Sequence, residues 1–135
     1  MTYDTIEEAF DFVSGAPPCE HLAVVHRITG ESYFASSLVG IDEIPEEAEG
    51  DDDYLWIPHK YDLDLEKALV MDYVRIRCAD EFDEVCDIFR RKGAYGRFKD
   101  LLAQKGLLDD WYAFEQERTR AALVNWCTEN GIELE

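Results

Sequence analysis

The sequence is poor in basic residues. It has 31 aspartates and glutamates against 13 lysines and arginines, which gives a formal net charge of −18 at pH 7. A surface this acidic repels nucleic acid and anionic lipid at long range and favours basic partners. These numbers favour a protein partner, in particular a basic one, over nucleic acid. Acidity also serves solubility, so it does not identify the partner.

Long apolar runs and a basic start are also missing. No stretch of about eighteen consecutive apolar residues occurs, and the first ten residues, MTYDTIEEAF, are acidic. A secretory signal peptide begins with a basic segment followed by an apolar one. We therefore expect no membrane partner and a cytoplasmic location.

Cysteine is scarce and scattered. The four residues, Cys19, Cys78, Cys86 and Cys127, include no CxxC pair. Zinc sites draw closely spaced ligands, and secreted disulfide scaffolds are shorter and richer in cysteine. We expect reduced, mostly buried thiols. A Walker loop, a dinucleotide-binding glycine pattern, HExxH and GxSxG are absent as well, so we predict no metal and no cofactor.

The chain nevertheless has the composition of a folded protein. With 135 residues, 47% of them hydrophobic and 13% aromatic, it is long enough to bury a core. We predict a single domain over residues 1–135. The acidity belongs to its first half, because residues 1–66 contain 17 acidic and two basic residues, whereas residues 67–135 contain 14 and 11.

The first half predicts a short helix followed by strands. Within residues 1–18, TIEEAFDFVSG has the capping-box spacing of Thr5 and Glu8 and stops at Gly15. Within residues 20–60, HLAVVHRITGESYFASSLVG predicts a hairpin and YLWIPH a third strand. Residues 42–53, DEIPEEAEGDDD, predict a mobile acidic loop. A metal site at Asp51–Asp53 is the alternative, but the spacing of a calcium loop is missing.

Residues 62–131 predict about four helices. The first expected helix places Leu65, Ala68, Leu69, Tyr73 and Ile76 on one face, and the last places Trp111, Phe114, Ala121, Ala122 and Trp126 on one side. The expected fold class is α+β, with a small antiparallel sheet of about three strands, a C-terminal group of about four helices and a short N-terminal helix.

A basic cluster interrupts the helical half. Five of the 13 basic residues fall within ten positions of RRKGAYGRFKD, namely Arg90, Arg91, Lys92, Arg97 and Lys99. The first three lie where a helix carboxyl end favours cations, and Gly93 suits a left-handed cap. The other two lie within the next expected helix, on either side of Phe98, and this placement leaves them without a capping role.

Charged residues also fall on apolar helical faces. Asp72 lies among the apolar residues of its helix, and Arg118 lies on the side of Trp111 and Phe114. Isolated buried charge is costly, so each residue should be paired, partly exposed or functional. We favour internal ion pairs, for example Asp72 or Asp100 with Arg97 or Arg118. The alternative is a cleft in which arginines receive an anionic group.

Several short motifs resemble those of one bacterial family. They are TGE at Thr29–Glu31, YLWIP at Tyr54–Pro58, MDY at Met71–Tyr73, KGAYGRFKD at Lys92–Asp100, WYAF at Trp111–Phe114, and Trp126 followed by ENGIE. The chain resembles, over about residues 20–135, the uncharacterised family numbered zero-one-five-eight. Gly96 stands where the family pattern has arginine. The resemblance implies no activity, but it singles out as binding candidates Asp72, Arg97, Phe98, Lys99, Asp100, Trp111 and Arg118.

The sequence leaves the function open between several classes. A non-enzymatic interaction or regulatory module is the leading hypothesis, because the chain is small and very acidic and lacks catalytic motifs. The alternatives are a nucleic-acid-associated protein or an acidic mimic of nucleic acid, a small enzyme with an anionic-substrate cleft, and an immunity or antitoxin-like neutraliser. The partner's identity and the oligomeric state are not determined by these patterns.

Overall fold

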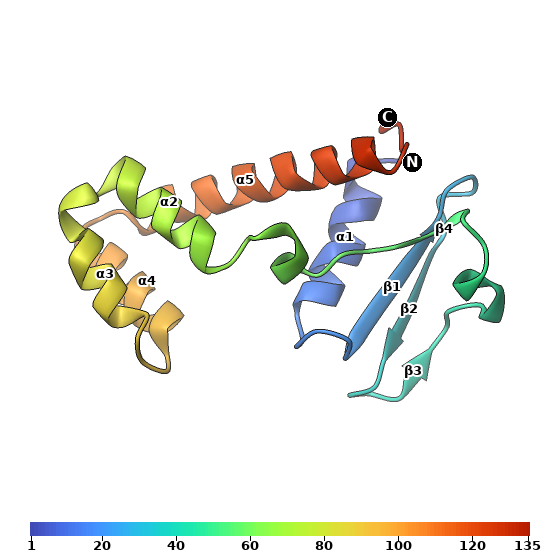
Figure 1. Cartoon of the computed structure of the whole chain (residues 1–135), viewed down its shortest axis with the longest axis horizontal. Helices are drawn as coiled ribbons and strands as arrows, with labels where there is room; N and C mark the ends of the chain where they lie inside the picture. The colour runs from blue at the N-terminus through green and yellow to red at the C-terminus, as the bar shows by residue number, and fades with distance from the viewer. The chain divides into compact units, whose positions relative to one another are not determined.

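The computed structural model describes residues Met1–Glu135 and divides the chain into two compact units. Unit 1 comprises Met1–Leu63 and Arg120–Glu135, and unit 2 comprises Asp64–Thr119. Five α-helices and one four-stranded antiparallel sheet make up the fold (Figure 1). The predicted α+β class is confirmed. Whether the whole chain folds as one cooperative domain stays a prediction.

The sheet lies in unit 1 and has the strand order β3-β2-β1-β4. Strands β1 (His21–His26) and β2 (Ser32–Ser36) form the predicted hairpin, and β4 (Tyr54–Trp56) pairs with the other side of β1. The fourth strand, β3 (Ile41–Asp42), is missing from the sequence prediction. It is only two residues long and leads into the segment expected to be a loop, so it carries no alternating pattern.

Helix α1 (Tyr3–Ser14) covers one face of the sheet. Its Phe12 ring stacks on His21, with 4.3 Å between ring centroids, and meets Phe34 edge-on at 5.0 Å. The helix begins earlier than predicted, because its N-cap is Thr2, whose hydroxyl oxygen accepts a hydrogen bond from the Thr5 backbone N–H. The helix ends as predicted, with Gly15 as its C-cap.

A buried histidine joins two loops of unit 1. His59 Nδ1 accepts a hydrogen bond from the Tyr61 backbone N–H at 3.1 Å, and its Nε2 lies 2.8 Å from the Ala16 carbonyl oxygen. Since Nδ1 accepts, Nε2 must carry the proton and donate to Ala16. The neutral imidazole therefore ties the segment after β4, which forms the short 3₁₀ helix η2 (Lys60–Leu63), to the end of α1.

Unit 2 is helical. It contains α2 (Lys67–Arg77), the 3₁₀ turn η3 (Ala79–Glu81), α3 (Phe82–Ile88), α4 (Ala94–Gln104) and the first part of α5 (Leu108–Glu129). Gly93 has φ of 74°, but its predicted role as the C-terminal cap of the preceding helix is wrong, because α3 already ends at Ile88 with Phe89 as C-cap and Gly93 is the N-cap of α4. The core of the unit consists of Leu69, Val70, Tyr73, Val74, Val85, Phe98, Leu102, Trp111 and Phe114.

The apolar face predicted for α2 is partly wrong. Ile76 is 58% exposed and Ala68 is exposed, whereas Val70 and Val74 are fully buried. The buried side is made by two adjacent pairs one turn apart, Leu69 with Val70 and Tyr73 with Val74. The centre of the buried face of α2 is therefore rotated from the predicted face toward Val70 and Val74, and Ile76 lies outside the buried face.

Helix α5 differs more strongly from prediction, because it supplies buried side chains to both units. Trp111 and Phe114 belong to the core of unit 2, whereas Leu123 and Cys127 are buried in unit 1, and Ala121 is exposed. A single apolar side therefore does not describe α5. No helix of the chain is long and apolar enough to cross a membrane.

The shared helix predicts that both units unfold together. The variant Trp56→Phe/Trp126→Phe keeps only Trp111, a reporter of unit 2, and Trp111→Phe keeps only the indoles of unit 1. In each variant we expect denaturant transitions measured by tryptophan fluorescence and by far-ultraviolet circular dichroism to coincide, because loss of one core removes packing that holds α5. A fluorescence transition displaced from the dichroism transition would show two independent domains.

Candidate functional site

The structure brings together two of the predicted site residues of unit 2, Asp72 and Arg118. An Asp72 carboxylate oxygen lies 3.7 Å from Arg118 Nη1, and its second oxygen lies 3.8 Å from Arg75 Nη1. The Asp72 and Arg118 side chains are 48% and 43% exposed. Arg118 also lies over the Phe114 ring, 4.8 Å from its centroid. The pair is one of the combinations expected from the sequence, but it lies at the surface of the unit, so the expectation of an internal ion pair is wrong.

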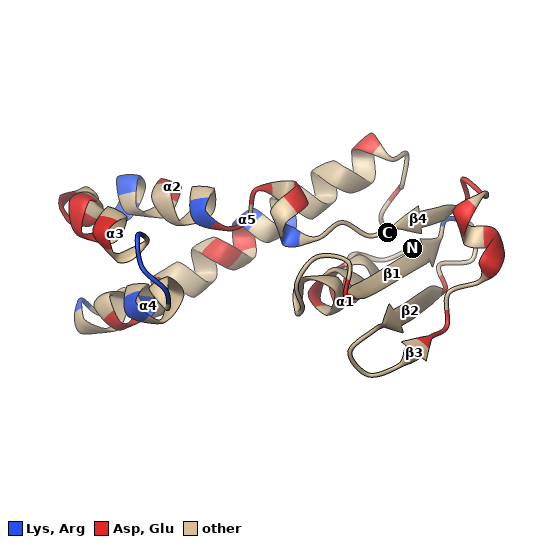
Figure 2. Ribbon diagram, turned by 60° about the horizontal axis from the view of Figure 1, so that its bottom comes forward, with Lys and Arg blue, Asp and Glu red and all other residues tan.

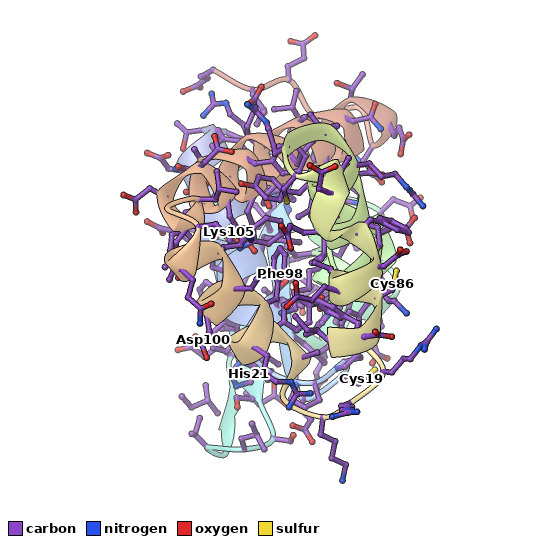
Figure 3. All side chains as sticks on the ribbon, turned by 90° about the vertical axis from the view of Figure 1, so that its left-hand side faces the viewer. Cys19, His21, Cys86, Phe98, Asp100 and Lys105 are labelled. Carbon is purple, nitrogen blue, oxygen red and sulfur yellow. The ribbon has the colours of Figure 1, made fainter.

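The other charged candidates do not join this pair. Arg97 Nη2 donates a hydrogen bond of 3.5 Å to the Ile88 carbonyl oxygen at the carboxyl end of α3, so the expectation that Arg97 has no capping role is wrong. Lys99 Nζ lies 5.4 Å from the centroid of the Tyr112 ring. Asp100 is exposed and lies on the outer side of α4 (Figure 3). No single anion site is formed by Arg97, Lys99 and Arg118.

The two aromatic candidates belong to the core. Phe98 is fully buried and lies between α3 and α4 (Figure 3), and its ring centroid is 5.1 Å from that of Trp111. Trp111 packs edge-on against Tyr73 at 5.2 Å, and its Nε1 has no hydrogen-bond partner. Both rings are enclosed by the helices of unit 2.

The pKa shifts of unit 2 arise from contacts that hold its helices together. Burial, followed by the hydrogen bond that the Tyr73 hydroxyl donates to Asp110 at 2.9 Å, raises the pKa of Tyr73. The ammonium of Lys105, 3.0 Å from Glu81, lowers the pKa of that carboxyl, and Glu81 in turn raises the pKa of Lys105. These shifts have structural partners, so they do not mark a reactive centre.

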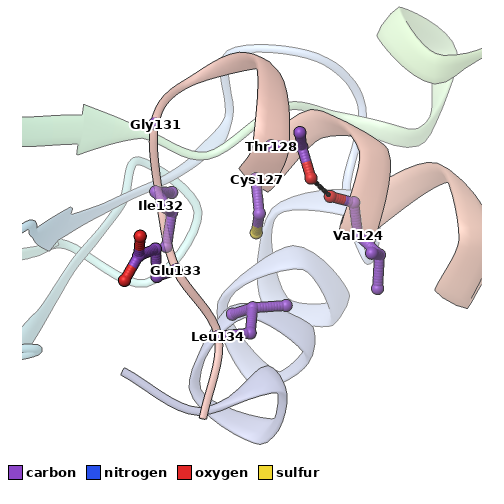
Figure 4. A pocket seen from close by; sticks show the side chains of 7 residues that line it. All are labelled: Val124, Cys127, Thr128, Gly131, Ile132, Glu133 and Leu134. Carbon is purple, nitrogen blue, oxygen red and sulfur yellow. Dashed lines mark hydrogen bonds between the residues drawn. The ribbon is translucent and has the colours of Figure 1, made fainter.

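A hollow of about 630 Å³ lies in unit 1 beside the last turns of α5 (Figure 4). The Cys127 thiol points toward it, but burial raises the pKa of this thiol and so disfavours the nucleophilic thiolate. The Thr128 hydroxyl donates to the Val124 carbonyl oxygen at 3.1 Å. Because the thiolate is disfavoured and the hydroxyl is already hydrogen-bonded, neither group is well suited to act as a nucleophile in this hollow. Its lining consists of Val124, Cys127, Thr128, Gly131, Ile132, Glu133 and Leu134.

The sheet of unit 1 offers a more distinctive surface, because α1 covers only one of its faces. Successive strand residues point to opposite faces, and His21 packs against α1, so Leu22 points to the other face. The register places Ala35 opposite Leu22, and Val24 is paired with Trp56. Leu22 is 36% exposed and Trp56 is 41% exposed. The second face is therefore apolar and partly open.

The acidic segment forms one wall of this open face. Instead of burying little, it contains β3 and the 3₁₀ helix η1 (Glu46–Glu49), and Ala48 is only 2% exposed. The Trp56 indole Nε1 donates to the Ala48 carbonyl oxygen at 3.4 Å, which fixes η1 beside β4. The buried Ala48 side chain and the hydrogen bond from the Trp56 indole hold this charged segment in a defined position.

Between the sheet and this segment lies a groove of about 440 Å³. Its floor and one wall are apolar, and its rim carries three carboxylates. The side chains of Glu46 and Glu49 form no hydrogen bond or ion pair within the chain, and Asp42 accepts one from the Ile44 backbone N–H. No basic residue lines the groove, which consists of Leu22, Ala35, Asp42, Ile44, Pro45, Glu46, Glu49 and Trp56.

Sequence reasoning missed this groove, although one signal was available. YLWIPH was correctly predicted to be a strand, and a strand that places tryptophan next to an acidic segment suggests a binding surface. What the sequence could not supply was the return of residues 42–49 across the sheet, since that depends on a single buried alanine.

The positions of the side chains do not support a metal site. No group of three or more histidine, cysteine, aspartate or glutamate side chains is arranged to hold a metal ion. In the segment Asp51–Asp53, an Asp51 carboxylate oxygen accepts from the Asp53 backbone N–H at 2.9 Å. All four cysteines are free thiols. The expectation that most are buried is wrong, because only Cys127 is buried and Cys19 is exposed.

Comparison with known proteins yields one match. The model of an uncharacterised protein family, UPF0158, matches residues 31–135. The matched span begins after β1, so α1 and Leu22 lie outside it, whereas the acidic wall and Trp56 lie inside it. Neither a curated protein nor a solved structure is significantly similar to the chain.

The buried position of Phe98 predicts a large effect on stability. Phe98→Ala removes a fully buried ring and should lower the free energy of unfolding by about 3–5 kcal/mol. The adjacent Lys99→Ala is the matched control and should change it by less than about 1 kcal/mol. Chemical denaturation measures both. If Phe98→Ala lowered the free energy of unfolding by less than about 1 kcal/mol, Phe98 would not be a core residue.

The exposed position of the Asp72–Arg118 pair predicts a weak coupling. A double-mutant cycle with Asp72→Asn and Arg118→Gln should give a coupling free energy of about 0.2–1 kcal/mol, since both charges remain hydrated. The coupling should shrink further as salt is raised, because exposed charges are screened. A coupling above about 2 kcal/mol would instead indicate a desolvated network with a role beyond surface pairing.

Proposed function

Because the chain belongs to the uncharacterised protein family UPF0158, whose description assigns no activity, we propose a function from the structure: a protein-interaction module. The groove defined above is its binding surface, and an apolar segment of a partner protein is its ligand. The observation that carries the proposal is the open sheet face at Leu22, Ala35 and Trp56, bounded by carboxylates.

The distribution of charge supports a basic partner. Unit 1 contains 18 acidic and three basic residues, a balance of −15, whereas unit 2 contains 13 and ten, a balance of −3. Figure 2 shows acidic residues gathered on η1 and the turn that leads to β4, and basic residues at the turn between α3 and α4. Complementary charge speeds association and excludes wrong partners, so the acidic rim favours a ligand with basic residues beside its apolar ones.

The lining of the groove is suited to binding. Its exposed apolar residues include an aromatic side chain, and rigid aromatic residues are enriched among those that dominate interface energetics. Apart from the indole, every polar side chain in the lining is a carboxylate. The candidate residues in unit 2 are less available to a partner, because Asp72 and Arg118 are paired with each other and Phe98 and Trp111 are buried.

The proposal predicts that a charge placed in the groove floor abolishes partner binding. Tagged protein would be used to capture partners from a cell extract, and bound protein and nucleic acid would both be quantified. Leu22→Asp should reduce the captured partner by at least about tenfold, because it places a charge in an apolar contact. Leu38→Asp is the matched control, since Leu38 is 59% exposed, lies just after β2 and does not line the groove.

A third variant, Arg97→Glu/Lys99→Glu, tests the alternative surface in unit 2. The captured partner should be unchanged in this variant, and every variant is first checked for a native dichroism spectrum and unfolding midpoint. A partner lost in this variant and retained in Leu22→Asp would contradict the proposal and move the interface to α4. Nucleic acid in the bound fraction, released steeply by salt, would favour the nucleic-acid alternative.

A further inference from the structure

The indole of Trp56 is held in one orientation within the groove. Its Nε1 donates to the Ala48 carbonyl oxygen, so the polar edge of the ring is occupied, while the residue as a whole stays 41% exposed. The face of an indole carries negative electrostatic potential, and among aromatic side chains it attracts cations best. This ring is therefore a fixed platform for a cation.

The carboxylates around Trp56 lack a counter-ion from their own unit. The three basic residues of unit 1 are Arg27, Lys60 and Arg120, and none lines the groove. Arg27 donates to the Asn130 carbonyl oxygen, and the guanidinium of Arg120 lies over the Tyr3 ring, 4.4 Å from its centroid. Arg27 lines a neighbouring hollow that shares Glu49 and Trp56 with the groove, but its guanidinium is held by Asn130, so no basic side chain of unit 1 lies in the groove to pair with Glu46 and Glu49.

The chain itself shows which cation suits such surroundings. In unit 2 the guanidinium of Arg118 lies over the Phe114 ring at 4.8 Å and at the same time pairs with Asp72 at 3.7 Å. Arg75 repeats the arrangement over Phe82, at 5.1 Å, with the other oxygen of Asp72. A planar guanidinium can stack on a ring and direct its N–H groups to carboxylates simultaneously, whereas a compact, strongly hydrated ammonium cannot do both as well.

Resting on the proposed function, we propose that the groove recognises an arginine side chain of the partner. The guanidinium lies on the Trp56 indole and pairs with the carboxylates of Glu46 and Glu49. Apolar residues next to this arginine in the partner occupy the surface of Leu22, Ile44 and Pro45. The partner's binding segment is thus an arginine flanked by apolar side chains, and lysine is a poorer substitute.

The test uses the full chain and three synthetic peptides. The probe is acetyl-Leu-Arg-Leu-amide, and in its two analogues lysine or citrulline replaces arginine. Citrulline keeps the planar shape of arginine and lacks its charge. Binding is followed by nuclear magnetic resonance through the Trp56 indole N–H signal, which is assigned by its absence in Trp56→Phe. The spectrum contains two further indole signals, from Trp111 and Trp126, which serve as internal references.

The arginine peptide should shift the Trp56 signal at low salt and lose affinity at about 0.5 M salt, because the charges are exposed. We expect about threefold weaker binding for the lysine peptide and about tenfold weaker binding for the citrulline peptide. Glu46→Gln/Glu49→Gln should weaken the arginine peptide about fivefold. The matched control Glu43→Gln, an exposed residue of the same segment that does not line the groove, should leave it unchanged.

Two results would overturn the inference. One is equal binding of the arginine and citrulline peptides. The other is an arginine peptide that leaves the Trp56 signal unmoved up to its solubility limit. Either result leaves the proposed function standing if partner capture still depends on Leu22. If Leu22→Asp captures the partner as well as Leu38→Asp does, the proposed function fails, and the arginine site fails with it.

Discussion

The packing of α5 is the constraint on which the rest of the structure depends. This helix must bury Trp111 and Phe114 in unit 2 and then Leu123 and Cys127 in unit 1. Because one helix supplies buried side chains to both units, each unit needs α5 folded to complete its own core. The residues between the two sets, which include exposed Arg118 and Ala121, carry no buried apolar side chain and so tolerate polar chemistry.

The groove follows from what unit 1 leaves uncovered. Helix α1 covers one face of a small sheet, and a charged segment held at Ala48 lies beside the second face, where Leu22 and Trp56 stay partly exposed. Like charges along η1 repel one another, so this segment cannot collapse onto the sheet as an apolar one would. The result is a surface with an apolar floor beside carboxylates, and exposed apolar surface with a polar rim is common at protein-interaction sites.

The sequence predicts local structure well wherever the apolar residues of an element all face the same core. The N-terminal helix, the hairpin, β4 and the turn at Gly93 follow from spacing, β-branched residues and a glycine with positive φ. The pattern failed for α5, whose two sets of buried residues belong to different cores, and for β3, which is too short to alternate. Among the site candidates, Asp72 with Arg118 was foreseen as a pair. The groove was not, because it depends on how residues 42–49 return across the sheet rather than on any spacing.

The turn before β1 has a practical consequence for chemical labelling. Cys19 is exposed, with φ of 73°, and it lines a shallow hollow that shares Leu22, Ala35 and Asp42 with the groove. Burial raises the pKa of the Cys78 and Cys127 thiols and so slows their alkylation. Cys86 is only partly exposed, so a maleimide dye reaches Cys19, the one exposed thiol, most easily. The native chain thus provides an attachment point for a fluorophore beside the groove, and no cysteine has to be engineered into it.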